Sequence, residues 1–259
     1  MQWNAQGIVL GTRKQGENNL ILEVMTLERG RCLGLVRGGR SRKQHPSLQA
    51  GNHLTLTWRG RLEEHLGSFT FEPLQLRAAN LMQFALTLHG LQTLTALLRL
   101  LPERDPHPQL YHAVDIILDH LEEPQIGAVL LQRFELELLR ELGFGLDLSL
   151  CAATGTTENL IWVSPRSGRA VCQEAGIPYE HLLLHLPPHL VPAKGQGNGQ
   201  GHELSTHNKN ENSATITSSD IQNGFKLTGY FLHKYIFEPR QITWPQARDS
   251  YIKALLSTI

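Results

Sequence analysis

A cluster of cationic side chains near the N-terminus is the part of the sequence best suited to chemistry. Arg29 and Arg31 flank Gly30, and a second run, from Arg37 to Lys43, contains two adjacent glycines. Arginine and lysine neutralise phosphates, and glycine lets a backbone approach a phosphate chain closely. The alternative is a solvated basic loop. The cations expected to contact nucleic acid are Arg29, Arg31, Arg37, Arg40, Arg42, Lys43 and Arg59.

Aromatic side chains in the same segment are available to stack on bases. They are Trp58, Phe69 and Phe71. Single-strand-binding barrels combine a basic groove with stacking aromatics, and Trp58, next to Arg59, is the better stacking residue. The alternative is that these aromatics belong to the core, which is the commoner position for Phe.

Two of the three cysteines stand at half of the positions of a zinc ribbon. Such a site needs two C-x-x-C pairs about 15–20 residues apart. Cys151 and Cys172 have this spacing, but Thr154 and Ala175 occupy the other two positions. We therefore expect two small buried thiols and no bound metal.

No pattern of an active site is present. The sequence lacks G-x-S-x-G, Walker A and H-E-x-x-H. His181 and His185 have the spacing of a helical metal pair, but no Glu accompanies them and Pro187–Pro188 would end the helix. We expect no catalytic residue and no cofactor, and hence a protein that is not an enzyme.

Composition limits the class of protein. The 259 residues carry 24 Lys and Arg against 24 Asp and Glu, which excludes a generally basic coat for nucleic acid. Residues 1–75, however, hold ten Lys and Arg against six Glu, so the basic part is N-terminal. The odd number of cysteines is typical of a reducing compartment, and no signal peptide or membrane span is evident. We expect a cytoplasmic protein.

Short apolar runs separated by glycine turns predict a small β-barrel in the first 75 residues. Alternation is clearest in Leu54, Leu56 and Trp58. Five short strands in about 70 residues fit the OB-fold. The expected strands are Gly7–Leu10, Asn19–Thr26, Arg31–Val36, His53–Arg59 and Glu64–Glu72.

The spacing then changes to three or four residues, which predicts helices. We expect them along Leu81–Leu101, over Gln109–Leu121 and Gly127–Leu142, from Ile221 to Tyr235, and after Pro245 with Thr243 as the N-cap. Residues 193–219 contain almost no large apolar side chains, which predicts flexibility. The expected domains are 1–75 (barrel), 76–148 (helical), 149–190 (small insert), 191–219 (flexible linker) and 220–259 (helices returning to the helical domain).

The order and spacing of several short stretches resemble the RecO family of bacterial recombination mediators and DNA repair proteins. The resemblance extends from Trp3 to about Ile252 and is interrupted at 193–219. The stretches that carry it are Gly7–Leu10, Gly16-Glu17 before Asn19–Ile21, Val36–Ser41, Leu142–Phe144, Ser164–Gly168 and Leu227–Leu232.

This resemblance implies an α+β multi-domain protein with an N-terminal OB-fold and a C-terminal helical bundle carrying a zinc-ribbon-like insert, here with half of its ligands lost. It also implies binding of single- and double-stranded DNA and annealing of complementary strands. The implied partners are RecR, RecF, and the RecA recombinase, which is loaded onto DNA coated by single-strand-binding protein. The cations and Trp58 named above are then the expected DNA-binding residues.

The resemblance further implies a receptor for the C-terminal tail of single-strand-binding protein. This acidic peptide ends in an apolar residue and a free carboxylate, so its receptor needs an apolar pocket rimmed by cations. The expected helix 127–142 offers an apolar row: Leu130, Phe134 and Leu138. We expect the tail to contact Arg133, Phe134 and Arg140. The alternative is that both arginines pair with Glu137.

Three rival functions remain at this point. A thiol- or metal-dependent enzyme would use Cys151 or Cys172 with a histidine. An OB-fold RNA-binding protein of translation would prefer structured RNA to single-stranded DNA. A pure scaffold would bind no nucleic acid.

Overall fold

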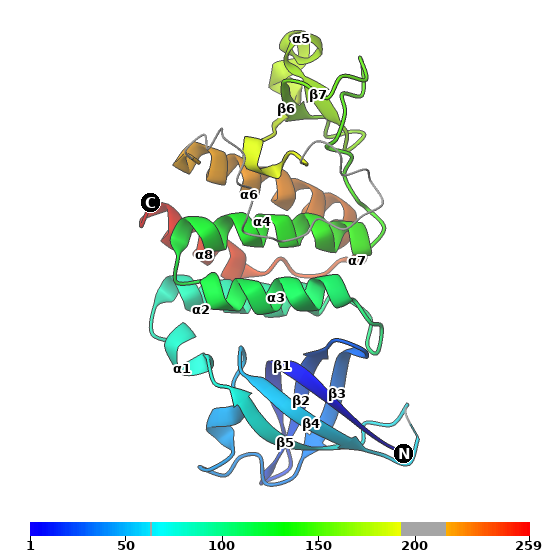
Figure 1. The fold of residues 1–259 in the computed structure, drawn as a ribbon, viewed down its shortest axis with the longest axis vertical. Helices are drawn as coiled ribbons and strands as arrows, with labels where there is room; N and C mark the ends of the chain where they lie inside the picture. The colour runs from blue at the N-terminus through cyan, green and yellow to red at the C-terminus, as the bar shows by residue number, and fades with distance from the viewer. Residues whose placement is uncertain (63, 193–215) are drawn as a thin grey trace. The chain divides into compact units, whose positions relative to one another are not determined.

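The computed structural model describes residues 1–62, 64–192 and 216–259, and it divides into two compact units, Met1–Glu122 and Glu123–Ile259 (Figure 1). Both units combine helices with a sheet, as expected for the α+β class. The division differs from the expected boundaries, because residues 76–122 belong with the barrel. Most of the expected linker, 191–219, lies outside the described residues. Within those residues, no helix is long and apolar enough to cross a membrane.

Five strands close into a barrel in the order β1-β2-β3-β5-β4. Neighbouring strands are antiparallel except β3 and β5, which pair in parallel at Leu35 and Ser68. The last strand begins four residues later than expected, and the first is longer at both ends. The strands are β1 (Gln2–Gln15), β2 (Asn19–Thr26), β3 (Gly30–Val36), β4 (His53–Arg59) and β5 (Ser68–Gln75), with a short 3-10 helix, η1 (His45–Leu48), between β3 and β4.

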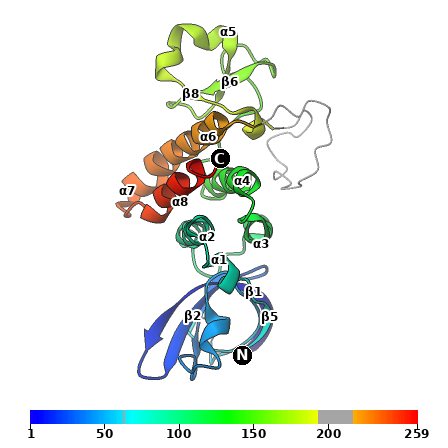
Figure 2. The same ribbon diagram turned by 90° about the vertical axis from the view of Figure 1, so that its left-hand side faces the viewer.

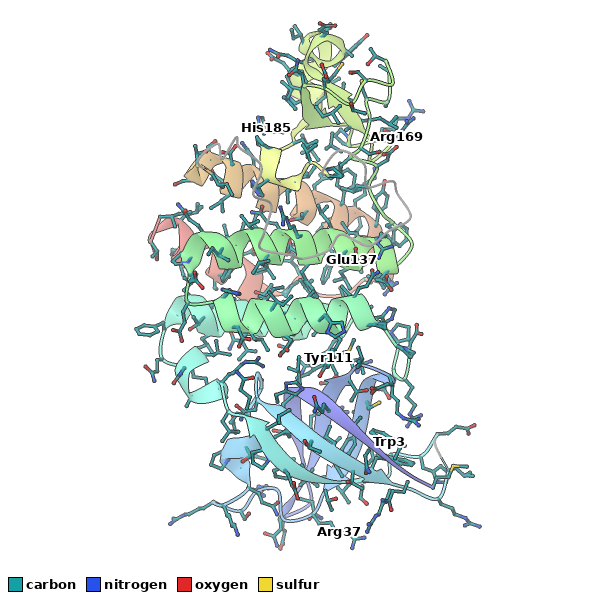
Figure 3. All side chains as sticks on the ribbon, viewed as in Figure 1. Trp3, Arg37, Tyr111, Glu137, Arg169 and His185 are labelled. Atoms are coloured by element: carbon teal, nitrogen blue, oxygen red, sulfur yellow. The ribbon has the colours of Figure 1, made fainter. Side chains whose placement is uncertain are left out.

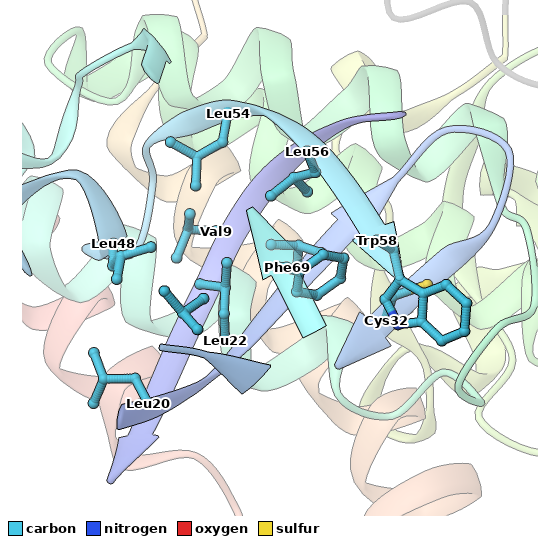
Figure 4. Close-up of a cluster of buried hydrophobic side chains, with 11 residues drawn as sticks. Val9, Leu20, Leu22, Cys32, Leu48, Leu54, Leu56, Trp58 and Phe69 are labelled. Carbon is cyan, nitrogen blue, oxygen red and sulfur yellow. The ribbon is translucent and has the colours of Figure 1, made fainter. Parts of the chain in front are cut away.

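The barrel core consists of inward-facing side chains from all five strands (Figure 4). Alternate residues of β4, namely Leu54, Leu56 and Trp58, face it, because successive side chains of a strand point to opposite faces. Glycines make room for the largest of them. A Cβ atom added to Gly60 or Gly67 would lie within 2.4 Å of the Trp58 ring.

Three helices complete the first unit: α1 (Ala78–Leu81), α2 (Ala85–Leu98) and α3 (Pro108–His120). The helical run expected from Leu81 onward is broken between α1 and α2. Polar contacts tie α3 to the rest of the unit. Arg77 donates to Asp115 at 2.8 Å and to Asp119 at 2.7 Å, and His53 Nε2 lies 2.8 Å from the Tyr111 hydroxyl. These contacts explain why the helices after the barrel belong to its unit.

The second unit is built on three helices that lie side by side: α4 (Pro124–Glu141), α6 (Ser218–Leu232) and α8 (Gln246–Leu256) (Figure 2). A turn of π-helix (His233–Phe237) and α7 (Glu238–Arg240) follow α6. A buried cluster joins the three helices. Arg248 on α8 donates to both carboxylate oxygens of Glu135 on α4, at 2.6 and 2.9 Å, and Thr228 on α6 donates to the same carboxylate.

A small module within this unit contains a three-stranded sheet of order β7-β6-β8. Its elements are β6 (Leu160–Val163), β7 (Ala170–Cys172), α5 (Gln173–Gly176), β8 (Leu184–His185), and the 3-10 helices η2 (Ile177–Leu182) and η3 (Pro188–Leu190). A helix joining His181 to His185 is absent, because η2 ends at Leu182 and His185 lies in a strand.

The helix caps differ in part from those expected. The residue before α8 is Pro245, and no side chain caps this helix, so Thr243 as the N-cap is wrong. A capping box instead begins α6, where Thr217 and Asp220 each accept a hydrogen bond from the other's backbone N–H. At the end of α4, Gly143 has a φ of 88°, as expected for a C-terminal glycine.

Candidate nucleic-acid interface

A groove of about 560 Å³ lies on the barrel surface between the segment after β3 and the paired strands β4 and β5. Val36 and Phe69, both buried, form its apolar base. Its other lining residues are polar or partly exposed. They are Arg37, Lys43, Gln44, Ser47, Arg59, Ser68, Thr70, Phe71 and Pro73. Arg37 lies at the end of the barrel remote from Tyr111 (Figure 3).

Three of the expected DNA-binding cations meet in this groove: Arg37, Lys43 and Arg59. No carboxylate is among the described residues that line it. Arg37 and Lys43 are exposed, and the structure gives neither an acidic partner within the part of the chain that it describes. Arg59 is exposed and donates to the Gln2 side-chain oxygen at 3.0 Å, so its charge is not neutralised by that contact. The groove can therefore take an anionic chain.

The loop that carries two of these cations has a defined conformation. Gly38 has a φ of 66°, and its N–H donates to the Asn19 side chain at 3.0 Å. The Arg40 guanidinium donates to the backbone oxygen of Glu17, which fixes this loop against the turn after β1. Arg40 and Arg42 are exposed on the same loop but do not line the groove.

The other two expected cations have local partners instead. Arg31 forms an ion pair with Glu23 at 2.8 Å and also donates to the carbonyl oxygen of Leu101. The guanidinium of Arg29 lies 4.8 Å from the centre of the Trp3 ring, in cation–π geometry. Neither residue lines the groove, so the structure does not bring all seven cations together.

The structure places Trp58 in the core rather than on the surface. Its side chain is 2% exposed and its indole N–H donates to the Leu66 carbonyl oxygen at 3.1 Å. The interpretation of Trp58 as a base-stacking surface is therefore replaced by the core alternative. Two other aromatics line the groove: Phe69 is buried, and Phe71 is partly exposed.

Several lining residues were not singled out from the sequence. Ser47, Ser68 and Thr70 place hydroxyl groups beside the cations, and Gln44 adds an amide. Scattered hydroxyl residues form no motif, so only the folded barrel identifies them. Trp3 does not line the groove, and its contact with the core was not expected from the sequence either. It is partly buried and stacks on Trp58, with ring centres 5.7 Å apart.

The apolar row expected to receive a peptide tail is not a surface. Leu130, Phe134 and Leu138 are buried in the second unit, with Phe134 fully buried. Arg140 pairs with Glu137, which is the alternative considered for it. Arg133 instead donates to the carbonyl oxygen of His189 at 3.1 Å, and burial lowers its pKa. The spacing of the apolar residues on α4 thus reflects packing inside the second unit, and we place no peptide there.

The residues at the ribbon positions do not fit a zinc ion. The Thr154 hydroxyl lies 3.6 Å from the Cys172 sulfur, where a complete ribbon would have a second thiolate, and Ala175 has no donor atom. Within the described residues, no group of three or more His, Cys, Asp or Glu side chains is placed to hold a metal. A tetrahedral site needs a complete set of ligands, so two thiols alone are insufficient.

Comparison with known proteins covers the whole chain. Residues 1–77 match the family model "Recombination protein O N terminal", and residues 83–241 match "Recombination protein O C terminal". The protein of Sinorhizobium medicae named "DNA repair protein RecO" is 49% identical over 259 residues, which are all of this chain and 96% of that protein. The protein of the same name from Methylorubrum populi is 50% identical over 252 residues, 97% of each chain.

Proposed function

Since the chain belongs to the RecO family of DNA repair and recombination proteins, we propose that it is a non-enzymatic recombination mediator. In this proposal it binds single- and double-stranded DNA through its barrel and anneals complementary strands. It also helps to load RecA onto DNA coated by single-strand-binding protein, with RecR and RecF as further partners in the cytoplasm. Family membership supports these roles, and the groove supports the DNA-binding step.

The observation that carries the proposal is the groove lined by Arg37, Lys43 and Arg59 without a carboxylate. The phosphates of a nucleic acid would neutralise this set of cations. Each ion pair formed also releases counterions condensed on the nucleic acid, which favours binding. The hydroxyl group of Thr70 can donate to a phosphate oxygen as well, whereas that of Ser68 donates to the Arg59 carbonyl oxygen at 3.4 Å. The groove therefore has the composition of a path for a nucleic-acid backbone.

The barrel itself supports the interpretation as an OB-fold. Its closed order β1-β2-β3-β5-β4, with the parallel contact between β3 and β5, is the Greek-key plan of that fold. In OB-folds a basic groove follows the backbone while aromatic rings stack on bases. Phe71, in the groove beside the cations, is positioned for that role.

The test is the salt dependence of binding. We replace Arg37, Lys43 and Arg59 together by Ala and measure the affinity for a fluorescent single-stranded oligonucleotide at several salt concentrations. Each phosphate contact on a single strand contributes about 0.7 to the slope of log K against log salt, so the slope should flatten by about two units. Binding should weaken most at low salt.

The matched control removes three exposed cations from the second unit: Arg166, Lys226 and Lys253. This variant changes the net charge by the same amount as the groove variant. If the groove is the binding site, the control should leave the slope almost unchanged. Equal losses in both variants would mean that DNA responds only to overall charge. Tighter binding of a structured RNA than of the DNA strand would instead favour an RNA-binding role.

A further inference from the structure

Two cysteines lie next to each other in the small module of the second unit. The backbone N–H of Ala152 donates to the Ala170 oxygen at 2.8 Å, so the segment that begins at Cys151 runs beside β7. The last residue of β7 is Cys172, and its backbone N–H donates to the Cys151 sulfur at 3.3 Å. The Thr154 hydroxyl lies 3.6 Å from the Cys172 sulfur. Both thiols therefore share one small environment.

The surroundings of Cys151 favour its thiolate. Burial raises the pKa of this thiol, but hydrogen bonds from the Thr154 hydroxyl and from the N–H groups of Cys172, Thr154 and Ala153 outweigh burial. Together they lower the pKa to about 6. A thiolate is the nucleophilic form of cysteine, so this lowered pKa favours attack by Cys151 on a reagent that reaches it.

The third cysteine provides an internal contrast. Cys32 is buried in the barrel, and its sulfur donates to the Arg29 carbonyl oxygen at 3.4 Å. Burial raises the pKa of this thiol. Cys32 therefore stays a protonated, unreactive thiol under conditions that ionise Cys151.

We propose that Cys151 and Cys172 form a reversible disulfide, which makes the small module a redox-responsive element. The positions at which a complete ribbon would hold a metal thus retain a thiol pair with chemistry of its own. A bond between them would close a loop formed by residues 152–171, which contains β6 and both of its turns. The disulfide would tie the two sides of the module together, as a metal does in a complete ribbon.

The oxidant is a small-molecule disulfide such as oxidised glutathione. The Cys151 thiolate attacks one sulfur of the reagent, forms a mixed disulfide and releases one glutathione thiolate. That thiolate takes the proton of Cys172, whose sulfur then attacks the Cys151 sulfur and displaces the second glutathione. Two protein thiols are oxidised and one glutathione disulfide is reduced to two thiols. Because both cysteines are buried, a local opening of the module must admit the reagent.

The experiment uses the full chain, reduced and then incubated with oxidised glutathione. Samples are quenched in acid, alkylated after denaturation and analysed by intact mass and peptide mapping. We expect a single alkylated cysteine, Cys32, together with a linked peptide containing Cys151 and Cys172 that is lost on reduction. The Cys172→Ser variant should stop at a glutathione adduct on Cys151. The Cys32→Ser variant should form the disulfide as the wild type does.

A rate comparison in the wild-type protein needs no variant and so does not depend on folding of a mutant. With limiting thiol reagent, Cys151 should react roughly fivefold or more faster than Cys32, since its larger thiolate fraction outweighs its lower intrinsic nucleophilicity. Three alkylated cysteines after incubation with oxidised glutathione, or faster reaction of Cys32, would overturn the proposal. Stoichiometric zinc that is lost in Cys151→Ser would overturn it too, because the thiols would then be metal ligands.

Discussion

Phe71 offers the sharpest test of the proposal that the groove binds single-stranded DNA. The ring lines the groove beside Arg59 and Thr70 and is partly exposed, so a base can reach it. Stacking of one base on an aromatic ring contributes about 1–3 kcal/mol. Phe71→Ala should therefore weaken binding of single-stranded DNA roughly 5- to 140-fold, at 1.4 kcal/mol per tenfold change in affinity. The salt slope should stay constant, because no phosphate contact is lost.

The assay is fluorescence anisotropy with a labelled single strand, titrated at several salt concentrations. Phe71 also packs against the barrel core, so thermal unfolding of each variant must be measured in parallel. Phe71→Tyr keeps the ring and serves as the matched control, with affinity close to that of the wild type. Unchanged affinity in a folded Phe71→Ala variant would refute the stacking argument, and a flattened slope would mean that the ring acts by positioning neighbouring cations.

Three further predictions concern stability. Trp58→Ala should lower the free energy of unfolding by about 3–5 kcal/mol in urea titrations, because it empties the barrel core; a stable variant with weakened DNA binding would contradict this. Glu135→Ala should lower the free energy of unfolding by about 3–5 kcal/mol, because it leaves Arg248 buried without its acidic partner. The double variant Glu135→Leu with Arg248→Met should recover most of that loss. Burial, together with the nearby charge of Arg133, lowers the pKa of His189 to about 4 in the folded protein. As the pH falls, His189 is therefore protonated at a higher pH in the unfolded chain than in the folded protein. Stability should therefore fall as the pH drops from about 6.5 to 4, by up to about 3 kcal/mol, and His189→Gln should remove this dependence.

The barrel was predictable because its pattern is local. Alternation along β4 placed Leu54 and Leu56 inside, and both face the core. The same alternation puts Trp58 on the same face as these leucines, so the pattern that predicted the strand also argued against a surface role for Trp58. Stacking chemistry was assigned by residue type, whereas burial depends on which face of the strand a residue occupies.

The helical domain shows the same limit. The spacing of Leu130, Phe134 and Leu138 predicts one face of a helix, but it does not say whether that face meets solvent or another helix. In the structure this face is buried. The contact between Glu135 and Arg248 spans 113 residues, and no local pattern announces such a pair. Long-range packing therefore decided both the buried ion pair and the loss of the expected peptide pocket.

The charges of the first 75 residues support the proposal that the groove cations bind an anionic ligand. Ten Lys and Arg face only six Glu in this segment, so part of the positive charge has no acidic counterpart there. Glu23, whose side chain is 13% exposed, is paired with both Arg31 and Arg99. Those pairs satisfy cations near the helices, while the groove cations remain without carboxylates. Uncompensated cations in one groove repel each other and weaken the compact state. In the proposed function, a phosphate chain bound in the groove would supply the missing negative charge and relieve this repulsion.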